Sequence, residues 1–281
     1  MIDFVMRKLA CAIAAIALIG KPALAADMAV KAPPPAAPVA PVVNWTGFYV
    51  GGNLGGVAEH ASGTSDFLDT CSAGCFPFGG FPTNPQSNSF SSTRLLGGVQ
   101  AGYNWQFNPQ WLVGLEGDWD WTSTRYSFCR ITDQLAAPCF NNGFGFENIS
   151  SKTDWLATVR GRLGWVWGNL LFYGTGGAAW GHVNTTVTLN CLGAGGCGNS
   201  VTLLTGTSST STTKAGWVAG LGAEGMLTKN LSVRAEWLHI DLGTISDSVT
   251  TVGTALSTQT AVWSRTERYD EFRVGVNYLF H

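Results

Sequence analysis

The sequence is poor in charge and has no long apolar run after its first segment. Only 12% of its 281 residues are charged, and the formal net charge is −2. An average globular domain carries about 25% charged residues. A weakly acidic chain offers no basic surface for phosphates, so we expect no nucleic-acid partner. No later stretch reaches about 18 continuous apolar residues, so the sequence predicts no transmembrane helix.

Histidine is also scarce. The chain has four histidines and no histidine-rich cluster, so the sequence predicts no metal site and no cofactor. Glycine and tryptophan are instead plentiful, with 36 and 12 residues respectively. This composition is unusual for a cytosolic enzyme.

The first 44 residues have the composition of targeting and linker segments. Arg7 and Lys8 precede an apolar region, and Ala23-Leu24-Ala25 offers a cleavage site, so residues 1–25 are predicted to be a signal peptide. Cys11 lies at the start of that apolar region, which disfavours a lipoprotein. Residues 26–44 are rich in proline and alanine and predict an extended periplasmic tail. The folded domain is predicted to cover residues 45–281.

From Trp45 onward the sequence alternates with period two, which is the pattern of β-strands. In the last segment, Phe272, Val274, Val276, Tyr278 and Phe280 share one face, and polar residues share the other. The same pattern predicts eight strands, at 46–57, 95–107, 111–121, 153–165, 169–182, 215–227, 231–237 and 271–280.

The connections alternate between short and long. Short turns are predicted at 108–110, 168–169 and 228–230, and long loops at 58–93, 122–151, 184–212 and 243–267. Such alternation is typical of an outer-membrane barrel. We therefore predict an all-β fold, an eight-stranded antiparallel up-and-down transmembrane β-barrel with short periplasmic turns, long extracellular loops and both termini in the periplasm.

Tryptophans gather near both ends of the predicted strands, as expected of two interfacial girdles. One group is Trp45, Trp105, Trp111, Trp165 and Trp167; the other is Trp119, Trp121, Trp155, Trp180, Trp217 and Trp237. Eight strands leave a lumen just wide enough for side chains. The polar face is therefore predicted to form an ion-paired plug, made by Glu116, Asp118, Arg160, Arg162, Glu224, Arg234, Glu236, Glu271 and Arg273.

Two motifs resemble a known family, the small outer-membrane immunogenic barrels of alphaproteobacteria. The opening strand motif Asn44-Trp-Thr-Gly-Phe-Tyr-Val-Gly-Gly52 carries one part of the resemblance. The other is the final segment, in which Arg273, Gly275, Tyr278 and Phe280 match the signal that the barrel-assembly machinery reads, although His281 follows the phenylalanine. The resemblance implies a surface protein of the outer membrane and, for some members, haem binding.

Six cysteines fall in pairs inside the first three predicted loops. If these loops project separately, only bonds within a loop are local, so we predict three disulfides in an oxidising compartment. The pairs are Cys71 with Cys75, Cys129 with Cys139, and Cys191 with Cys197. Zinc binding by the first pair is the alternative.

The function expected from these patterns is envelope-structural and non-enzymatic, with the loops presented to host or environment. Expected partners are outer-membrane lipid and lipopolysaccharide, the barrel-assembly machinery and an extracellular ligand. A small-solute channel, and haem or ligand capture by the loops with His60 contributing, remain alternatives. His239 and Asp241 are the residues that a rim enzyme would use, but we predict no catalytic residue. Gly220–Gly225 matches a dinucleotide motif without the required strand-to-helix context.

Overall fold

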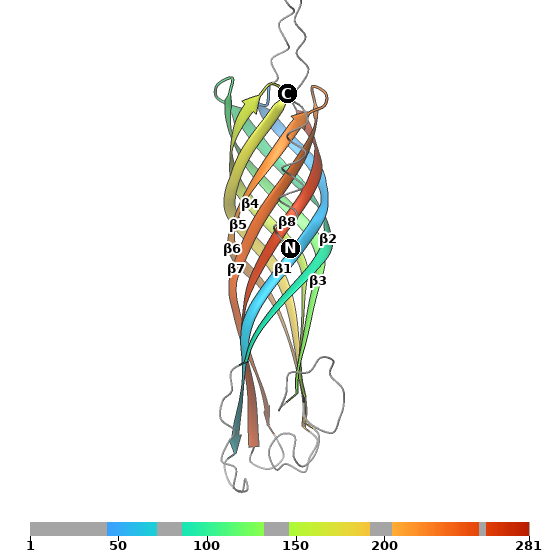
Figure 1. The fold of residues 1–281 in the computed structure, drawn as a ribbon, viewed down its shortest axis with the longest axis vertical. Coiled ribbons are helices and arrows are strands. Elements are labelled where there is room, and N and C mark those ends of the chain that lie inside the picture. Colours follow the sequence, from blue (N-terminus) through green and yellow to red (C-terminus); the bar gives the residue numbers. More distant parts are fainter. Residues whose placement is uncertain (1–43, 72–85, 132–145, 192–203, 253–256, 281) are drawn as a thin grey trace, which may run out of the picture. The chain divides into compact units, whose positions relative to one another are not determined.

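A computed structural model describes residues 44–71, 86–131, 146–191, 204–252 and 257–280. All eight elements in these ranges are β-strands (Figure 1). They are β1 (Gly47–Cys71), β2 (Gln86–Gln106), β3 (Trp111–Ile131), β4 (Phe146–Trp167), β5 (Leu170–Cys191), β6 (Leu204–Met226), β7 (Leu231–Val252) and β8 (Ser257–Phe280). Within the described ranges, no helix is long and apolar enough to cross a membrane.

The strands close into a barrel in which each pairs antiparallel with the next and β8 pairs with β1. The predicted eight-stranded antiparallel up-and-down barrel is thereby confirmed. The short turns at 107–110, 168–169 and 227–230 lie where the sequence predicts them, and Gly168 adopts a positive φ of 63° in one of them, a conformation that glycine adopts without strain. We call the end of the barrel that carries these short turns the turn end, and the opposite end the far end.

The predicted signal peptide and all but the last residue of the predicted tail lie outside the described residues. So do Cys75, Cys139 and Cys197, and the side chains of Cys71, Cys129 and Cys191. The three disulfides therefore stay predictions.

The predicted long loops are wrong in extent, because the strands continue well past their predicted far ends. β1, for example, runs to Cys71 rather than ending near residue 57, and β6 starts at Leu204 rather than 215. The added lengths are rich in serine, threonine and glycine on the outward face. Strands whose outward face meets water lose the apolar alternation on which the sequence prediction depended.

The barrel is closed over only part of its length. The β2–β3 ladder ends at Leu96 and Thr122, and the β6–β7 ladder ends at Trp217 and Asp241. Beyond these levels, the described strands form two four-stranded sheets, β7-β8-β1-β2 and β3-β4-β5-β6. We call them leaf A and leaf B.

Side chains hold the two leaves together. Phe90 of leaf A meets Tyr126 of leaf B edge to face, with ring centroids 4.7 Å apart. Arg265 Nη2 donates to Ser151 Oγ at 2.8 Å. A buried apolar cluster also draws on both leaves, from Ile149, Val183, Val187, Ile245 and Trp263. Burial of these side chains stabilises the extension without a continuous ring of backbone bonds.

Candidate functional site

The outward face of the closed barrel is apolar and is bounded by tryptophan pairs. Trp111 lies opposite Trp165 near the turn end, and Trp121 lies opposite Trp155 toward the far end. On β3 these limits enclose eleven residues, from Trp111 to Trp121. A transmembrane strand needs about 9–11 residues, so the wall between the two pairs matches the apolar core of a bilayer.

Trp45 is an exception to the predicted girdles. Its side chain is fully buried inside the turn end of the barrel, in an apolar cluster with Tyr49 and Leu112. The prediction that Trp45 belongs to an interfacial girdle is wrong, because the alternation begins only with β1 and Trp45 precedes it.

The lumen contains a buried network of charged side chains, in which four arginines pair with acids. Arg160 lies at its centre, and its guanidinium donates to Glu236 Oε1 at 2.9 Å, to Asp118 Oδ2 at 2.7 Å and to Glu116. Its side chain is fully buried. Because Arg160 comes from β4, Glu236 from β7 and the acids from β3, this contact joins opposite parts of the wall.

The other three arginines complete the network. Arg273 Nε donates to Glu236 at 2.9 Å, and its Nη2 lies 3.1 Å from Asp118. Arg162 donates to Glu224 at 2.9 Å, and Arg234 pairs with Glu116. A buried guanidinium needs such compensation, since an unpaired buried charge costs several kcal/mol.

The structure brings all nine predicted lumen residues together. It adds Asp120, whose Oδ2 accepts from Arg273 Nη1 at 2.5 Å, and Tyr49, whose hydroxyl donates to Glu116 and accepts from Arg162 Nη1 at 3.1 Å. Asp120 lies on the same face of β3 as Glu116 and Asp118, so the alternation of the sequence could have placed it in the lumen. The sequence did not assign Tyr49 to the lumen, because glycines stand on both faces of β1 and weaken its alternation.

Inward-facing glycines make room for these side chains. A Cβ on Gly222 would lie 2.3 Å from the ring of Tyr173, and one on Gly98 would lie 1.9 Å from Asp120 Oδ1. Tyr173 in turn stacks under Arg162, whose guanidinium carbon lies 3.9 Å from the ring centroid. The motif at Gly220–Gly225 therefore serves packing within a strand.

Apolar layers lie on both sides of the charged network. The layer toward the far end consists of Val57, Leu96, Leu156, Ala179, Val218, Leu238, Ile240, Leu242 and Tyr269. Beyond it a second polar cluster pairs Arg265 with Glu267 and packs Arg265 over Tyr126. The sequence did not predict this cluster, because these residues fell in or beside predicted loops.

Comparison with known proteins gives the family. The model of the outer membrane protein beta-barrel domain matches residues 23–280. This chain belongs to the outer-membrane β-barrel family. Its wall, lumen and closed antiparallel sheet agree with that membership.

Relatives of this outer-membrane barrel are outer-membrane proteins of Brucella and Rhizobium. It is 33% identical to the 31 kDa outer-membrane immunogenic protein of Brucella melitensis over 94% of this chain and 96% of the relative. It is 28% identical to a 22 kDa outer membrane protein of Rhizobium leguminosarum over 73% of this chain and 68% of the relative. Among solved structures, OprG of Pseudomonas aeruginosa is similar over 84% of this chain and 97% of its own, with 12% identity and a TM-score of 0.39.

The rim residues that an enzyme would use lie on the outward wall of this outer-membrane barrel. His239 Nδ1 lies 2.9 Å from Asp270, which His60 approaches at 3.6 Å. Asp241 accepts from Arg268 at 3.0 Å, and it does not contact His239 through a hydrogen bond in the described structure. Among the described residues, no three histidines, cysteines or acids are arranged to hold a metal.

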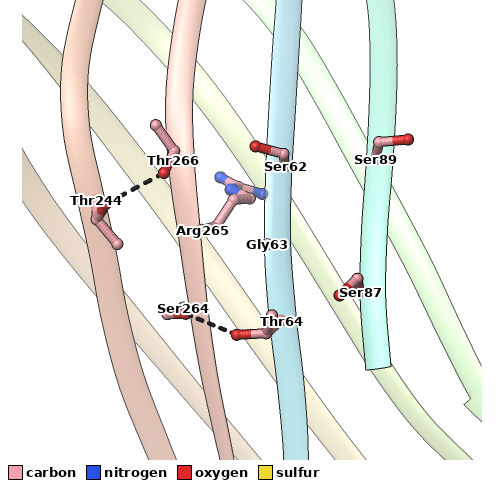
Figure 2. Close-up of a pocket in the computed structure, with 9 residues that line it drawn as sticks. All are labelled: Ser62, Gly63, Thr64, Ser87, Ser89, Thr244, Ser264, Arg265 and Thr266. Atoms are coloured by element: carbon pink, nitrogen blue, oxygen red, sulfur yellow. Dashed lines mark hydrogen bonds between the residues drawn. The ribbon is translucent and has the colours of Figure 1, made fainter. Parts of the chain in front are cut away.

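A shallow pocket of about 490 Å³ lies on leaf A, and its lining is mostly hydroxyl groups (Figure 2). Thr64 contacts Ser264 at 3.0 Å, and Thr244 contacts Thr266 at 3.1 Å. Both pairs bridge neighbouring strands. Their hydroxyls give the wall beyond the tryptophans a wet, polar surface.

The residues of the predicted assembly signal occupy both faces of β8. Arg273 points into the lumen network, and Gly275 lies beside Gly52 and Arg234. Tyr278 and Phe280 lie on the outward face, with ring centroids 5.0 Å apart. Their role in assembly stays a prediction.

Proposed function

We propose that this protein is a non-enzymatic, non-conducting outer-membrane barrel that presents its far end to the cell exterior. The observation that carries the proposal is the lumen network, in which Arg160 and Arg273 are fully buried and bonded to acids from two other strands, β3 and β7. A lumen filled by ion-paired side chains leaves the outer surface as the place for interaction.

The far end is suited to such a role by its construction. The leaves extend β7 from Asp241 to Val252 and β8 from Arg268 back to Ser257. At about 3.3 Å per residue this is a substantial projection beyond the tryptophan level. Residues 72–85, 132–145, 192–203 and 253–256 connect the strands at this end along the chain. We propose that these segments meet host or environmental molecules.

Single-channel conductance in a planar bilayer tests the closed lumen. We expect no steady current from the wild-type protein, with heat-modifiable gel migration showing that it is folded. A variant with Arg160→Ser, Glu236→Ser and Arg273→Ser serves as a positive control, because it removes the side chains that fill the lumen. Regular current steps from the wild type would contradict the proposal and make solute passage the leading function.

Labelling of intact cells tests the orientation. Ser127→Cys places a thiol on the exposed wall of β3 beyond the tryptophans. We expect a membrane-impermeant maleimide to label it without cell lysis, while the wild type provides the blank. Labelling that appears only after lysis would place the far end in the periplasm.

A further inference from the structure

Two cations lie directly opposite each other on the outward wall of leaf B. Arg125 of β3 and Lys152 of β4 are cross-strand partners in the register. Like charges at directly opposed positions destabilise a sheet. The arrangement therefore has a cost within the isolated chain, and an anion bound between the two side chains would offset it.

The acid nearby does not neutralise both cations. Asp154 pairs with Lys152 and also accepts from Asn184 Nδ2. The guanidinium of Arg125 is exposed and has no hydrogen-bond or ion-pair partner in the part of the chain that the structure describes. The patch thus carries an excess positive charge, and a guanidinium presents a fork of donors that fits phosphate oxygens.

An aromatic platform lies immediately below the two cations. Trp155 stacks on Trp119 with ring centroids 4.2 Å apart, and His182 lies parallel to Trp155 at 5.6 Å. Trp121, opposite Trp155, is 56% exposed. Below these rings the wall is apolar, with Leu115 and Val159 exposed.

Hydroxyl groups lie above the cations. Ser127 of β3 contacts Asn148, and Thr186 of β5 contacts Ser209 at 3.1 Å. Along leaf B the outward wall is therefore apolar, then aromatic, then cationic, then hydroxyl-rich. The same order of groups is found in a phosphorylated glycolipid, from acyl chains through phosphate to sugar.

We propose that Arg125 and Lys152 form a docking site for the phosphate of a glycolipid of the lipopolysaccharide class in the outer leaflet. The site deepens the proposed function, because it requires the far end of the barrel to lie in the leaflet that contains this lipid. The aromatic rings pack against the boundary of the acyl chains, and the hydroxyls of leaf B contact the sugars.

Arg268 provides the matched control. It is also an exposed cation on the outward wall, but it belongs to leaf A and is paired with Asp241 at 3.0 Å. Its replacement removes one positive charge at a comparable height without changing the patch.

Binding is measured with full-length protein refolded into phosphatidylcholine nanodiscs, titrated with a bisphosphorylated short-chain lipopolysaccharide and with the same lipid after dephosphorylation. We expect Arg125→Gln with Lys152→Gln to weaken binding of the phosphorylated lipid by about tenfold or more, since charge-assisted hydrogen bonds are about twice as strong as neutral ones. Arg268→Gln should bind as the wild type does, and the dephosphorylated lipid should not distinguish the variants.

Equal binding by the wild type and the double variant, with both shown to be folded by gel migration, would overturn the site. Equal loss in Arg268→Gln would show that only general charge matters and would also overturn it. This assay is independent of orientation in the cell, so failure of the surface labelling described above would contradict the proposed function and leave the phosphate chemistry of the patch to be judged separately.

Discussion

Arg273 Nη1, on the last strand, donates to Asp120 Oδ2 on β3 at 2.5 Å. The same guanidinium contacts Asp118 and Glu236. Replacing Arg273 with alanine leaves three buried acids without this partner, and breaking a buried pair costs about 3–5 kcal/mol. We expect a loss of that size in the free energy of unfolding, measured by urea titration in lipid vesicles.

The control for this variant is Arg268→Ala, which breaks an exposed ion pair with Asp241. Exposed pairs contribute about 0–1 kcal/mol. Similar losses in the two variants would show that the lumen network does not stabilise the fold more than a surface pair.

Glu271 and Glu236 should respond in opposite ways to neutralisation. Neither carboxylate oxygen of Glu271 has a hydrogen-bond partner in the described structure, and Arg273 Nη1 lies 3.9 Å away. Glu236 instead accepts from Arg160 and Arg273. Because six acids face four arginines here, Glu271→Gln should keep or raise stability, whereas Glu236→Gln should lower it by about 3 kcal/mol or more. Urea midpoints compare them, and equal losses would refute the distinction.

The wall of β4 provides a test of the lipid boundary. Val159 is exposed between Trp155 and Trp165, whereas Ser150 is exposed on the same strand beyond Trp155. Val159→Arg should reduce stability by about 2–4 kcal/mol, the cost of arginine near the bilayer midplane. Ser150→Arg should have an effect of about 0–1 kcal/mol in the same vesicles. If Val159→Arg left the stability unchanged, Val159 would not lie in the apolar core of the bilayer.

Phe280 and Phe48 are paired in the register of β1 and β8, and both are exposed. If Phe280 belongs to the assembly signal, Phe280→Ala should reduce the amount of barrel in the outer membrane several-fold in cells, while Phe48→Ala should not. Both purified variants should refold alike in detergent, because each loses one outward aromatic contact, Phe48 with Tyr103 and Phe280 with Tyr278. Equal levels of the two variants in membranes would show that Phe280 is not part of the assembly signal.

Gly222 and Gly174 allow a matched test of lumen packing. A Cβ on Gly222 would meet the Tyr173 ring at 2.3 Å, whereas one on Gly174 finds Leu221 at 3.8 Å. Gly222→Ala should therefore cost about 1–3 kcal/mol of stability through overpacking, and Gly174→Ala should be tolerated. Urea unfolding of the two variants measures the difference, and an unchanged Gly222→Ala would mean that Tyr173 moves aside freely.

Much of the barrel could be predicted because its two faces meet different surroundings. Where lipid lies outside and charge lies inside, as on β4 from Trp155 to Trp165, alternation assigns both the strand and its faces. The nine lumen residues follow from that parity. The distances between them do not, because parity says nothing about which side chains from distant strands meet.

The far end could not be predicted in the same way. Thr64, Thr244 and Ser264 lie on the exposed faces of strands, yet serine and threonine are also typical of loops. The division into two leaves depends on which ladders stop, at Leu96 and at Trp217. No local pattern in the sequence encodes that.

The length of the closed ladders gives a second estimate of the thickness of the membrane. The β2–β3 ladder covers Leu96–Gln106 and the β6–β7 ladder covers Trp217–Met226, so each is about as long as one bilayer crossing requires. Lipid offers backbone amides no alternative partner, whereas water does. The sheet therefore has no edge at the depth where an edge would be most costly, and it opens only near the level of Trp121 and Trp217. The number of backbone pairs in these two ladders thus matches the thickness of the surrounding membrane, independently of any side chain.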